Sequence, residues 1–250
     1  MNGQRVLVLG ATSAVAAEAA AIYARRGCRL HLVGRSPRKL DTVAARCREA
    51  GATVTSAEAD FTALDANAGV IARAFAELGQ LDVALIAHGD LGDQLASERA
   101  FDEAERILRV NFTSVVSLLV PLANHLELAR AGRLAVITSV AGDRGRPRNY
   151  TYGAAKGALA IYLQGLRTRL YPAGVSVTTL KLGPVDSPMT VDHAKHALFG
   201  KPPAVARGIV RAIDARADEA YVPKVWGAIM SIVRNTPEPV FRRLPFLSGR

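Results

Sequence analysis

The sequence has little cysteine and few aromatic residues, and it begins without a long apolar run. Its 250 residues include two cysteines, Cys28 and Cys47, which have no metal-ligand spacing, so we interpret both as reduced thiols. Aromatic residues make up 6%, which is ordinary for a globular chain rich in alanine, valine and leucine. The apolar run in MNGQRVLVLG is too short for a signal peptide or a membrane span, and we therefore expect a cytoplasmic protein.

The sequence also lacks a basic stripe interleaved with aromatic residues, although its formal net charge is +10. A basic chain can bind nucleic acid, an anionic membrane surface or a phosphorylated ligand. Here the arginines are dispersed, with small clusters at Arg25–Arg26, 144–148 and Arg242–Arg243. We therefore expect no nucleic-acid partner, and we interpret most of the charge as a generally basic surface.

Short apolar runs alternate with helical patterns along the whole chain, with no linker and no sequence repeat between them. Because the runs are apolar on both faces, the pattern predicts a parallel sheet covered by helices on both sides. We expect one Rossmann-like, doubly wound α/β domain over residues 1–250, with about seven strands. The expected strands are 5–10, 29–34, one inside 52–60, 80–89, 132–140, 174–183 and 219–223, and the expected helices are 14–26, one from 37, 65–78, 98–129, 150–171 and 203–216.

The stretch GATSAVAAEAA, residues 10–20, is typical of the turn at which a doubly wound fold binds a pyrophosphate. Backbone N–H groups and the N-terminus of the following helix supply positive charge there. The usual three glycines are not present, because Ala14 and Ala16 occupy the later positions. A dinucleotide site is one interpretation and a plain strand–helix turn is the other. The expected cofactor contacts in this turn are Gly10, Thr12, Ser13, Ala14 and Val15.

The second expected strand ends without the acidic residue that would accept hydrogen bonds from an adenosine ribose. Gly34 and Arg35 stand there instead. A guanidinium can bind a ribose 2′-phosphate through two hydrogen bonds, so the predicted cofactor is NADP(H) rather than NAD(H). The alternative is that Arg35 and Arg38 are solvated arginines at a helix start. After the third strand, we expect Asp60 to accept a hydrogen bond from the adenine amino group, with Phe61 beside it.

One helical segment carries a tyrosine and a lysine four residues apart, on the same helical face. With a pKa of about 10, a tyrosine is a poor acid–base group at neutral pH, but a nearby lysine cation stabilises the phenolate and lowers that pKa. Tyr152 and Lys156 form this pair, whereas Tyr150 and Tyr162 have no cation at that spacing. Ser139 ends the fifth expected strand, where its hydroxyl can hydrogen-bond a substrate oxygen.

These features, taken in order, make the chain resemble the short-chain dehydrogenase/reductase family over nearly its whole length. The resemblance implies a catalytic tetrad that transfers a hydride between NADP(H) and a carbonyl or secondary alcohol. It implies that Lys156 also holds the nicotinamide ribose, and that Asn111 holds a water linking this lysine to solvent. The tetrad consists of Asn111, Ser139, Tyr152 and Lys156. The further cofactor contacts that it implies are Asp60, Phe61, Ala87, Gly89, Tyr152, Lys156 and, in the stretch LGPVDSPM, Gly183, Val185 and Ser187.

The resemblance also implies a lid and an oligomer. Residues 190–199 would cover the substrate, and family habit indicates a homodimer or homotetramer. His193 and His196 lie in this stretch, but without a third ligand at proper spacing we expect no metal site. We interpret Gly153 and Gly157 as allowing the nicotinamide end of the cofactor, or a neighbouring helix, to approach the backbone.

The segment 224–250 forms a basic and apolar C-terminal tail, with an apolar stripe at helical spacing. One interpretation is that it packs on its own core or on a partner subunit, and the other is peripheral contact with an anionic membrane surface. Together with 88–94 and 149–166, it is similar to the decaprenylphosphoryl-2-keto-ribose reductases. That similarity implies a keto-sugar on a polyprenyl phosphate as substrate. A protein that keeps the fold and senses the cofactor, with weak catalysis, is the alternative to an enzyme.

Overall fold

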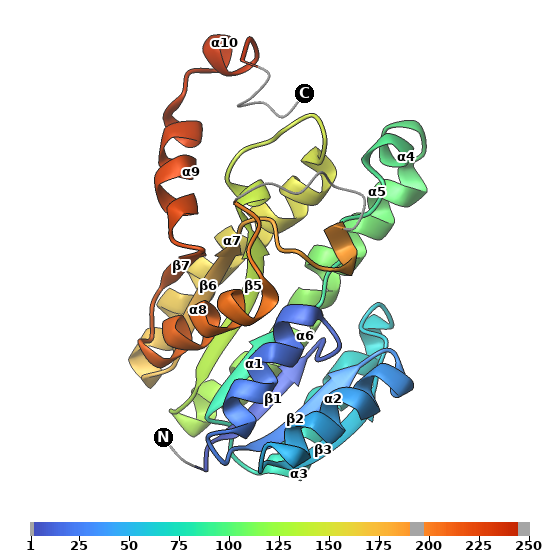
Figure 1. Cartoon of the computed structure of the whole chain (residues 1–250), viewed down its shortest axis with the longest axis vertical. Coiled ribbons are helices and arrows are strands. Elements are labelled where there is room, and N and C mark those ends of the chain that lie inside the picture. The colour runs from blue at the N-terminus through green and yellow to red at the C-terminus, as the bar shows by residue number, and fades with distance from the viewer. Residues whose placement is uncertain (1–2, 191–197, 245–250) are drawn as a thin grey trace.

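Seven parallel strands form one sheet in the computed structural model, which describes residues 3–190 and 198–244 (Figure 1). Along the sheet the order is β3-β2-β1-β4-β5-β6-β7. The order therefore reverses between β1 and β4, and ligands of such sheets bind beside this point, beyond the carboxyl ends of the strands. The predicted doubly wound fold is confirmed. The strands are β1 (Arg5–Leu9), β2 (Arg29–Gly34), β3 (Thr53–Glu58), β4 (Val83–Ile86), β5 (Arg133–Ser139), β6 (Ser176–Leu182) and β7 (Glu219–Val222).

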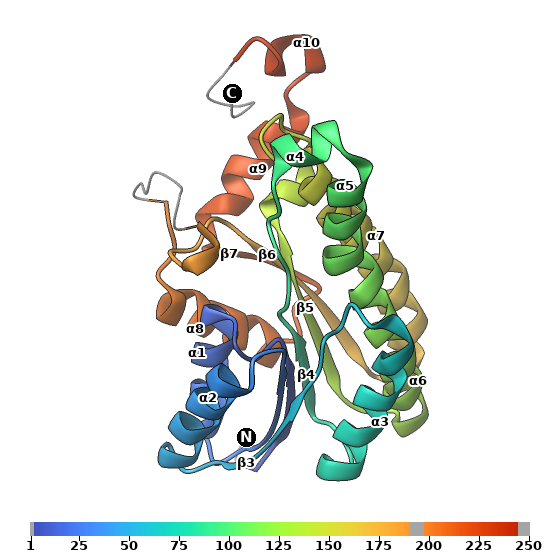
Figure 2. The ribbon, with the colours of Figure 1, turned by 90° about the vertical axis from the view of Figure 1, so that its right-hand side faces the viewer.

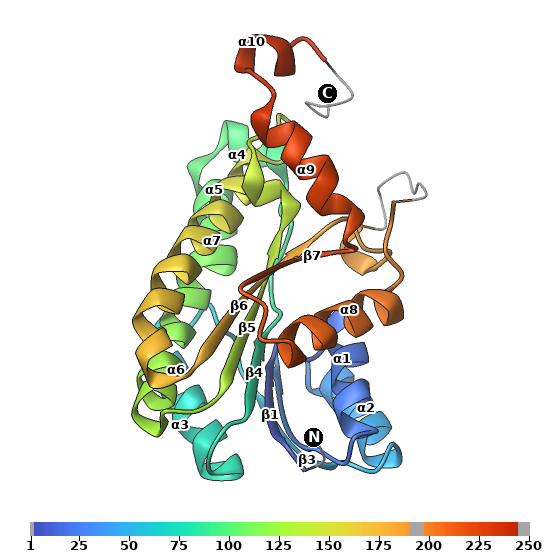
Figure 3. The same cartoon turned by 90° about the vertical axis from the view of Figure 1, so that its left-hand side faces the viewer.

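Helices cover both faces of the sheet, which is why the central strands are apolar on both sides (Figures 2 and 3). Alternate side chains of β1 enter different cores. Val6 and Val8 pack toward α1 (Ala14–Ala24), α2 (Pro37–Glu49) and α8 (Pro202–Asp214). Leu7 and Leu9 pack toward α3 (Asn67–Leu78), α6 (Ser114–Ala129) and α7 (Tyr150–Leu170). Each face of the sheet therefore has its own hydrophobic core.

The helix predicted over 98–129 differs from the structure in two ways. A separate short helix, α4 (Gln94–Arg99), precedes it, because the backbone of Ala100 is extended with φ −139° and ψ 129°. The continuous part then runs as α5 (Phe101–Leu108), one π-helical turn (Arg109–Thr113) and α6. The π turn contains Asn111, and single π turns inside helices occur frequently at functional sites.

By length and composition alone, the stretch Phe101–Ala129 is apolar enough to cross a membrane. However, 44% of its most apolar window is buried inside the protein. Leu118, Leu119 and Leu122 are fully buried against the sheet. We therefore interpret this stretch as a core helix of the domain.

The described part of the C-terminal tail packs on its own chain. It forms α9 (Val225–Asn235) and α10 (Glu238–Phe241), at the top of Figure 1. Trp226, Met230 and Val233 of α9 form a small core with Phe241 and with Val140, which follows β5. The tail thus covers the loop at the carboxyl end of β5.

Two stretches named in the sequence predictions lie outside the described residues. They are 191–197, which contains His193 and His196, and 245–250 at the end of the tail.

Candidate active site

Ser139 is the last residue of β5, and it begins a turn of 3-10 helix, η3 (Val140–Asp143). Its Oγ accepts a hydrogen bond from the N–H of Ala141 at 3.1 Å. The carbonyl of Leu182, at the end of β6, lies 3.5 Å from the same oxygen. The Ser139 hydroxyl therefore accepts from its own turn and donates, over a long distance, to the end of β6, and these two contacts orient it.

Glycines on α7 let the η3 turn lie directly on the helix backbone. A Cβ on Gly153 would lie 2.7 Å from the carbonyl oxygen of Ala141, and one on Gly157 would lie 2.8 Å from that of Gly142. Distances this short do not occur for real side chains, so larger residues would push the turn away. The element that approaches these glycines is therefore the turn that follows Ser139.

Tyr152 and Lys156 lie one turn apart on α7, as the spacing predicts. The Lys156 ammonium is 5.7 Å from the centre of the Tyr152 ring and donates to the carbonyl of Ile137 at 3.3 Å. Burial raises the pKa of Tyr152 to about 12, and a hydrogen bond with Ser139 opposes this rise. Burial also lowers the pKa of Lys156 to about 8.

Burial is the largest cause of the Tyr152 shift, and the predicted lowering of this pKa by Lys156 stays a prediction. Removal of the phenol from water disfavours its charged form, and this effect exceeds the stabilisation from its neighbours. A phenol that stays neutral at neutral pH is suited to donate a proton to a carbonyl oxygen. The role of Tyr152 as the acid in the reduction direction stays a prediction.

Asn111 is fully buried in the π turn and holds the loop that follows β4. Its Nδ2 donates to the carbonyls of Asp90 at 2.7 Å and Ile107 at 2.9 Å, and its Oδ1 accepts from the N–H of Asp90 at 3.1 Å. A Cβ on Gly89 would lie 2.9 Å from Oδ1 and 3.2 Å from the nitrogen of Lys156, so only glycine fits between them. Both amide hydrogens of Asn111 are engaged, and the water that it is predicted to hold stays a prediction.

The turn after β1 meets the loop after β4 at the point where the strand order reverses. Gly10 has a φ of +84°, and a Cβ there would lie 2.6 Å from the backbone nitrogen of His88. Glycine is required both for that conformation and for that close approach. Ser13 precedes α1 and makes no side-chain capping bond, so the first N–H groups of the helix keep their capacity to bind an anion. The cradle fits a dinucleotide pyrophosphate.

The residues expected around the adenosine lie beyond β2 and β3. Arg35 is exposed, and no ion pair joins it to a carboxylate among residues 3–190 and 198–244. Asp60 accepts from the N–H of Thr62 at 3.0 Å and from its hydroxyl at 2.8 Å. These bonds lower the pKa of Asp60, and the charge of Arg35 lowers it further. The charge of Arg35 thus acts on Asp60, and the roles of both residues at the adenosine stay predictions.

The loop after β6 begins beside Ser139 and is covered by the tail. A Cβ on Gly183 would lie 2.0 Å from the indole nitrogen of Trp226, so this side chain of α9 sits directly on the glycine. Val185 pairs with Gly200, and the N–H of Ser187 donates to the Thr190 hydroxyl at 3.3 Å. Sequence reasoning missed Trp226 as a neighbour of this loop, because nothing local connects α9 to Gly183.

His88 lies in the loop that follows β4 and makes a local hydrogen bond. Its Nε2 is 2.9 Å from the hydroxyl of Ser114, which itself donates to the carbonyl of Val110. Ser114 must therefore accept, so Nε2 carries the hydrogen and Nδ1 does not. Nδ1 is buried and has no hydrogen-bond partner among the described residues. The centre of the His88 ring lies 4.7 Å from that of the Phe61 ring, so His88 connects the loop after β4 to the segment after β3.

His88 is expected to make the protein less stable as the pH falls. Burial, with the Lys156 charge, lowers its pKa to about 3, whereas an unfolded chain has about 6.5. As the pH falls, the unfolded state therefore takes up the proton first. The contribution of His88 to the free energy of unfolding is fully present above about pH 6.5 and is lost progressively toward pH 3. Urea unfolding should show a loss of about 2 kcal/mol between pH 7 and pH 5 from this group.

The variant His88→Gln is the comparison, because it removes the titrating ring and retains a hydrogen-bonding side chain. Its free energy of unfolding should change less between the two pH values than that of the wild type. The same pH dependence in both proteins would show that His88 is not the group that titrates.

A buried cluster of charges holds the η3 turn in place. The nitrogen of Lys181 on β6 lies 2.7 Å from Asp143 and 2.9 Å from Glu219. The side chains of Lys181 and Asp143 are 6% and 4% exposed. The hydroxyl of Tyr221 on β7 donates to Asp143 at 2.7 Å. The end of the turn that starts at Ser139 is therefore tied to both β6 and β7.

The neighbouring Arg144 ties the same turn to the tail. Its guanidinium donates to the carbonyls of Val233, at 2.6 Å, and Thr236, and it pairs with Glu238 at 2.7 Å. It also lies 3.8 Å from the centre of the Phe241 ring. These contacts place α9 and α10 beside the Ser139 turn.

Comparison with known proteins agrees with this geometry. Residues 4–197 match the sequence pattern of the short chain dehydrogenases. An uncharacterized oxidoreductase of Streptomyces coelicolor is 32% identical over 240 residues, which cover 96% of this chain and 95% of the relative. An uncharacterized oxidoreductase of Mycobacterium tuberculosis is 33% identical over 241 residues, which cover 96% of each chain.

Solved structures share the fold. An actinorhodin polyketide ketoreductase with NADPH has a TM-score of 0.79 at 22% identity, over 88% of this chain and 97% of that one. A short-chain dehydrogenase/reductase of Mycobacterium ulcerans has a TM-score of 0.78 at 19% identity, over 88% and 89%. The sequence match spans most of the chain, and the relatives above 30% identity span nearly all of it, so this chain belongs to the short-chain dehydrogenase family.

Proposed function

We propose that the protein is an NADPH-dependent oxidoreductase that transfers hydride between NADP(H) and a carbonyl or secondary alcohol. The observation that carries this proposal is the arrangement of Ser139, Tyr152 and Lys156 at the carboxyl end of β5. The serine hydroxyl opposes the rise in the pKa of Tyr152, and the Lys156 ammonium lies 5.7 Å from the centre of the phenol ring. Asn111 and Gly89 close the same site from the β4 side.

Each of these side chains has a separate role in the proposed reaction. A bound nicotinamide dinucleotide supplies the hydride. Tyr152 donates its proton to the carbonyl oxygen as negative charge develops there, and Ser139 hydrogen-bonds the same oxygen and fixes its position. Lys156, with a pKa of about 8, is mostly protonated at neutral pH and stabilises the phenolate that remains.

NADP(H) is the proposed cofactor because the adenosine end presents a guanidinium. Arg35 is exposed at the end of β2, and Asp60, the acid near it, is engaged by Thr62. The 2′-phosphate of NADPH can take two hydrogen bonds from a guanidinium, whereas NADH has an uncharged 2′-hydroxyl at that position.

The proposed substrate class is a keto-sugar on a polyprenyl phosphate. This proposal is carried over from the similarity of residues 88–94, 149–166 and 224–250 to the decaprenylphosphoryl-2-keto-ribose reductases. The loop beside the site is polar, which suits a sugar. Asp90 pairs with Arg106 at 2.6 Å, and their side chains are 46% and 44% exposed. Asp90 is also the residue whose backbone Asn111 holds.

The test is turnover of a panel of ketones, keto-sugars and alcohols, including polyprenyl-phosphate keto-sugars, with NADPH and with NADH. We expect reduction with NADPH to be preferred, and Arg35→Ala to reduce the preference roughly tenfold or more, because charge-assisted hydrogen bonds are lost. Arg73→Ala, which changes an exposed arginine on α3, is the matched control. Equal rates with both cofactors would contradict the role of Arg35.

Tight NADPH binding without turnover of any panel member would favour the alternative, a cofactor-sensing protein that keeps the fold. This alternative rests on Ala14 and Ala16, which occupy the positions of the later glycines in the turn after β1.

A homodimer or homotetramer stays a prediction, as does peripheral membrane contact. Large apolar side chains exposed on the α6–α7 layer support self-association, and they include Leu128 at 86% and Ile161 at 70% exposure.

A further inference from the structure

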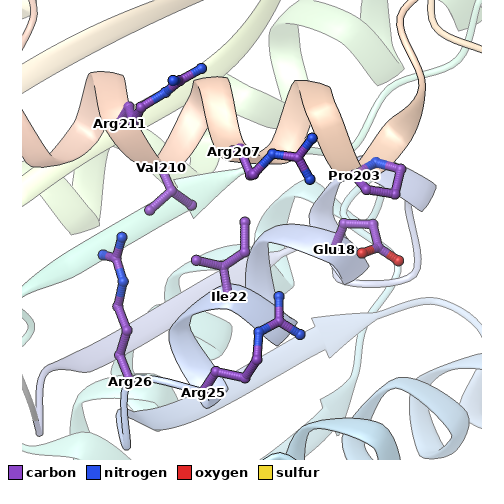
Figure 4. A pocket seen from close by; sticks show the side chains of 8 residues that line it. All are labelled: Glu18, Ile22, Arg25, Arg26, Pro203, Arg207, Val210 and Arg211. Atoms are coloured by element: carbon purple, nitrogen blue, oxygen red, sulfur yellow. The ribbon is translucent and has the colours of Figure 1, made fainter.

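A groove of about 360 Å³ runs between α1 and α8 on the outside of the domain (Figure 4). Ile22 of α1 and Val210 of α8 point toward each other and form its apolar floor. None of the predicted catalytic or cofactor-binding residues lines it. A ligand in this groove would therefore be separate from the substrate and the cofactor.

The groove has more positive charge than its surroundings neutralise. Four arginines line it, against one carboxylate, Glu18. Glu18 is held by Arg46 at 2.8 Å, and Arg26 is paired with Asp214 at 2.9 Å. Among the described residues, the other three arginines of the groove are in no ion pair. They are Arg25, which directly follows α1, and Arg207 and Arg211 of α8.

Local helix structure does not account for this charge. Arg207 and Arg211 are four residues apart on one face of α8, where like charges repel. Arg211, in the last turn of α8, and Arg25, at the end of α1, are favoured by the helix dipoles. Arg207 lies in the first half of α8, where the dipole does not favour a cation. A bound anion would remove both the repulsion and the mismatch.

We propose that this α1–α8 groove binds a ligand that carries a phosphate group next to an apolar part. Arg25 and Arg207, which lie on facing helices, hold the phosphate, because guanidinium groups bind phosphate oxygens through paired hydrogen bonds. Arg211 adds to the local charge, and the apolar part lies over Ile22 and Val210. The phosphate belongs either to a soluble ester or to a lipid headgroup at a membrane surface.

The experiment measures binding of hexyl phosphate by calorimetry with excess NADPH present, so that the cofactor turn is filled. Flotation with phosphatidylglycerol vesicles, against phosphatidylcholine vesicles, tests the lipid source. The double variant Arg25→Gln/Arg207→Gln is compared with Arg73→Gln/Arg99→Gln, which removes the same charge from exposed positions on α3 and α4. We expect the groove variant to weaken binding tenfold or more, and the control to leave it within about twofold.

The outcomes separate the proposal from a nonspecific surface effect. Binding of hexyl phosphate would identify a soluble ester, and binding of anionic vesicles alone would identify a headgroup, provided that only the groove variant weakens it. Equal loss in both double variants, or no binding of either probe, would overturn the proposal. Neither variant changes a residue of the proposed catalytic site, so lack of oxidoreductase activity would leave this test unaffected.

Discussion

Tyr152→Phe is expected to lower kcat by about 100- to 10,000-fold, which is the usual contribution of a positioned acid. The substitution removes only the phenol oxygen, so the ring remains packed on α7 and the site keeps its shape. NADPH binding should survive, because the turn at Gly10 and the adenosine end are not touched. Steady-state kinetics on any substrate found in the panel, together with NADPH titration, measures both effects.

The matched control is Tyr150→Phe, which removes the same atom from the same helix two residues earlier. Tyr150 is 46% exposed, and Ala154 stands four residues beyond it where a lysine follows Tyr152. This variant should retain nearly full activity. If Tyr152→Phe also kept rates close to those of the wild type, Tyr152 could not be the proton donor.

Lys181→Met is expected to lower the free energy of unfolding by about 3–5 kcal/mol, the usual cost of breaking a buried ion pair from one side. Methionine keeps the approximate length of the side chain but leaves Asp143 charged and buried at 4% exposure. Tyr221 remains as the hydrogen-bond partner of Asp143, and one neutral donor cannot replace the lysine. Urea unfolding at neutral pH measures the loss.

Two further variants separate burial from simple loss of a charge pair. Arg5→Met breaks the Arg5–Asp82 pair, whose side chains are 29% and 32% exposed, and should cost about 1 kcal/mol or less. The double variant Lys181→Met/Asp143→Leu should recover part of the stability, because it removes the second buried charge as well. If Lys181→Met cost no more than Arg5→Met, the buried cluster would not be a major source of stability.

The order of elements could be predicted because it depends on local patterns. Apolar runs that are buried on both faces alternate with helical periodicity, and that alternation permits few topologies. The spacing of Tyr152 and Lys156 is equally local, since four residues on a helix always bring two side chains to one face. Ser139 could be placed because it ends an apolar run, at the edge where parallel sheets carry their sites.

Other properties of the site depend on segments far apart in the chain. The pKa of Tyr152 is raised because the folded chain removes the phenol from water, and no spacing rule reports that burial. Asn111 holds the backbone of Asp90 through a π turn that its own sequence does not indicate. Trp226 covers Gly183 only after the tail has folded back over β6.

By itself, the sequence determined the doubly wound fold, the family and the identity of the residues that could carry the chemistry. These properties depend on hydrophobic periodicity and on short spacings along the backbone. Tertiary structure alone decided the direction of the Tyr152 pKa shift, the contacts that orient Ser139, and the place between α1 and α8 where unpaired arginines gather. These depend on burial and on distances through space, because solvent exposure and charge pairing exist only when distant segments have packed together.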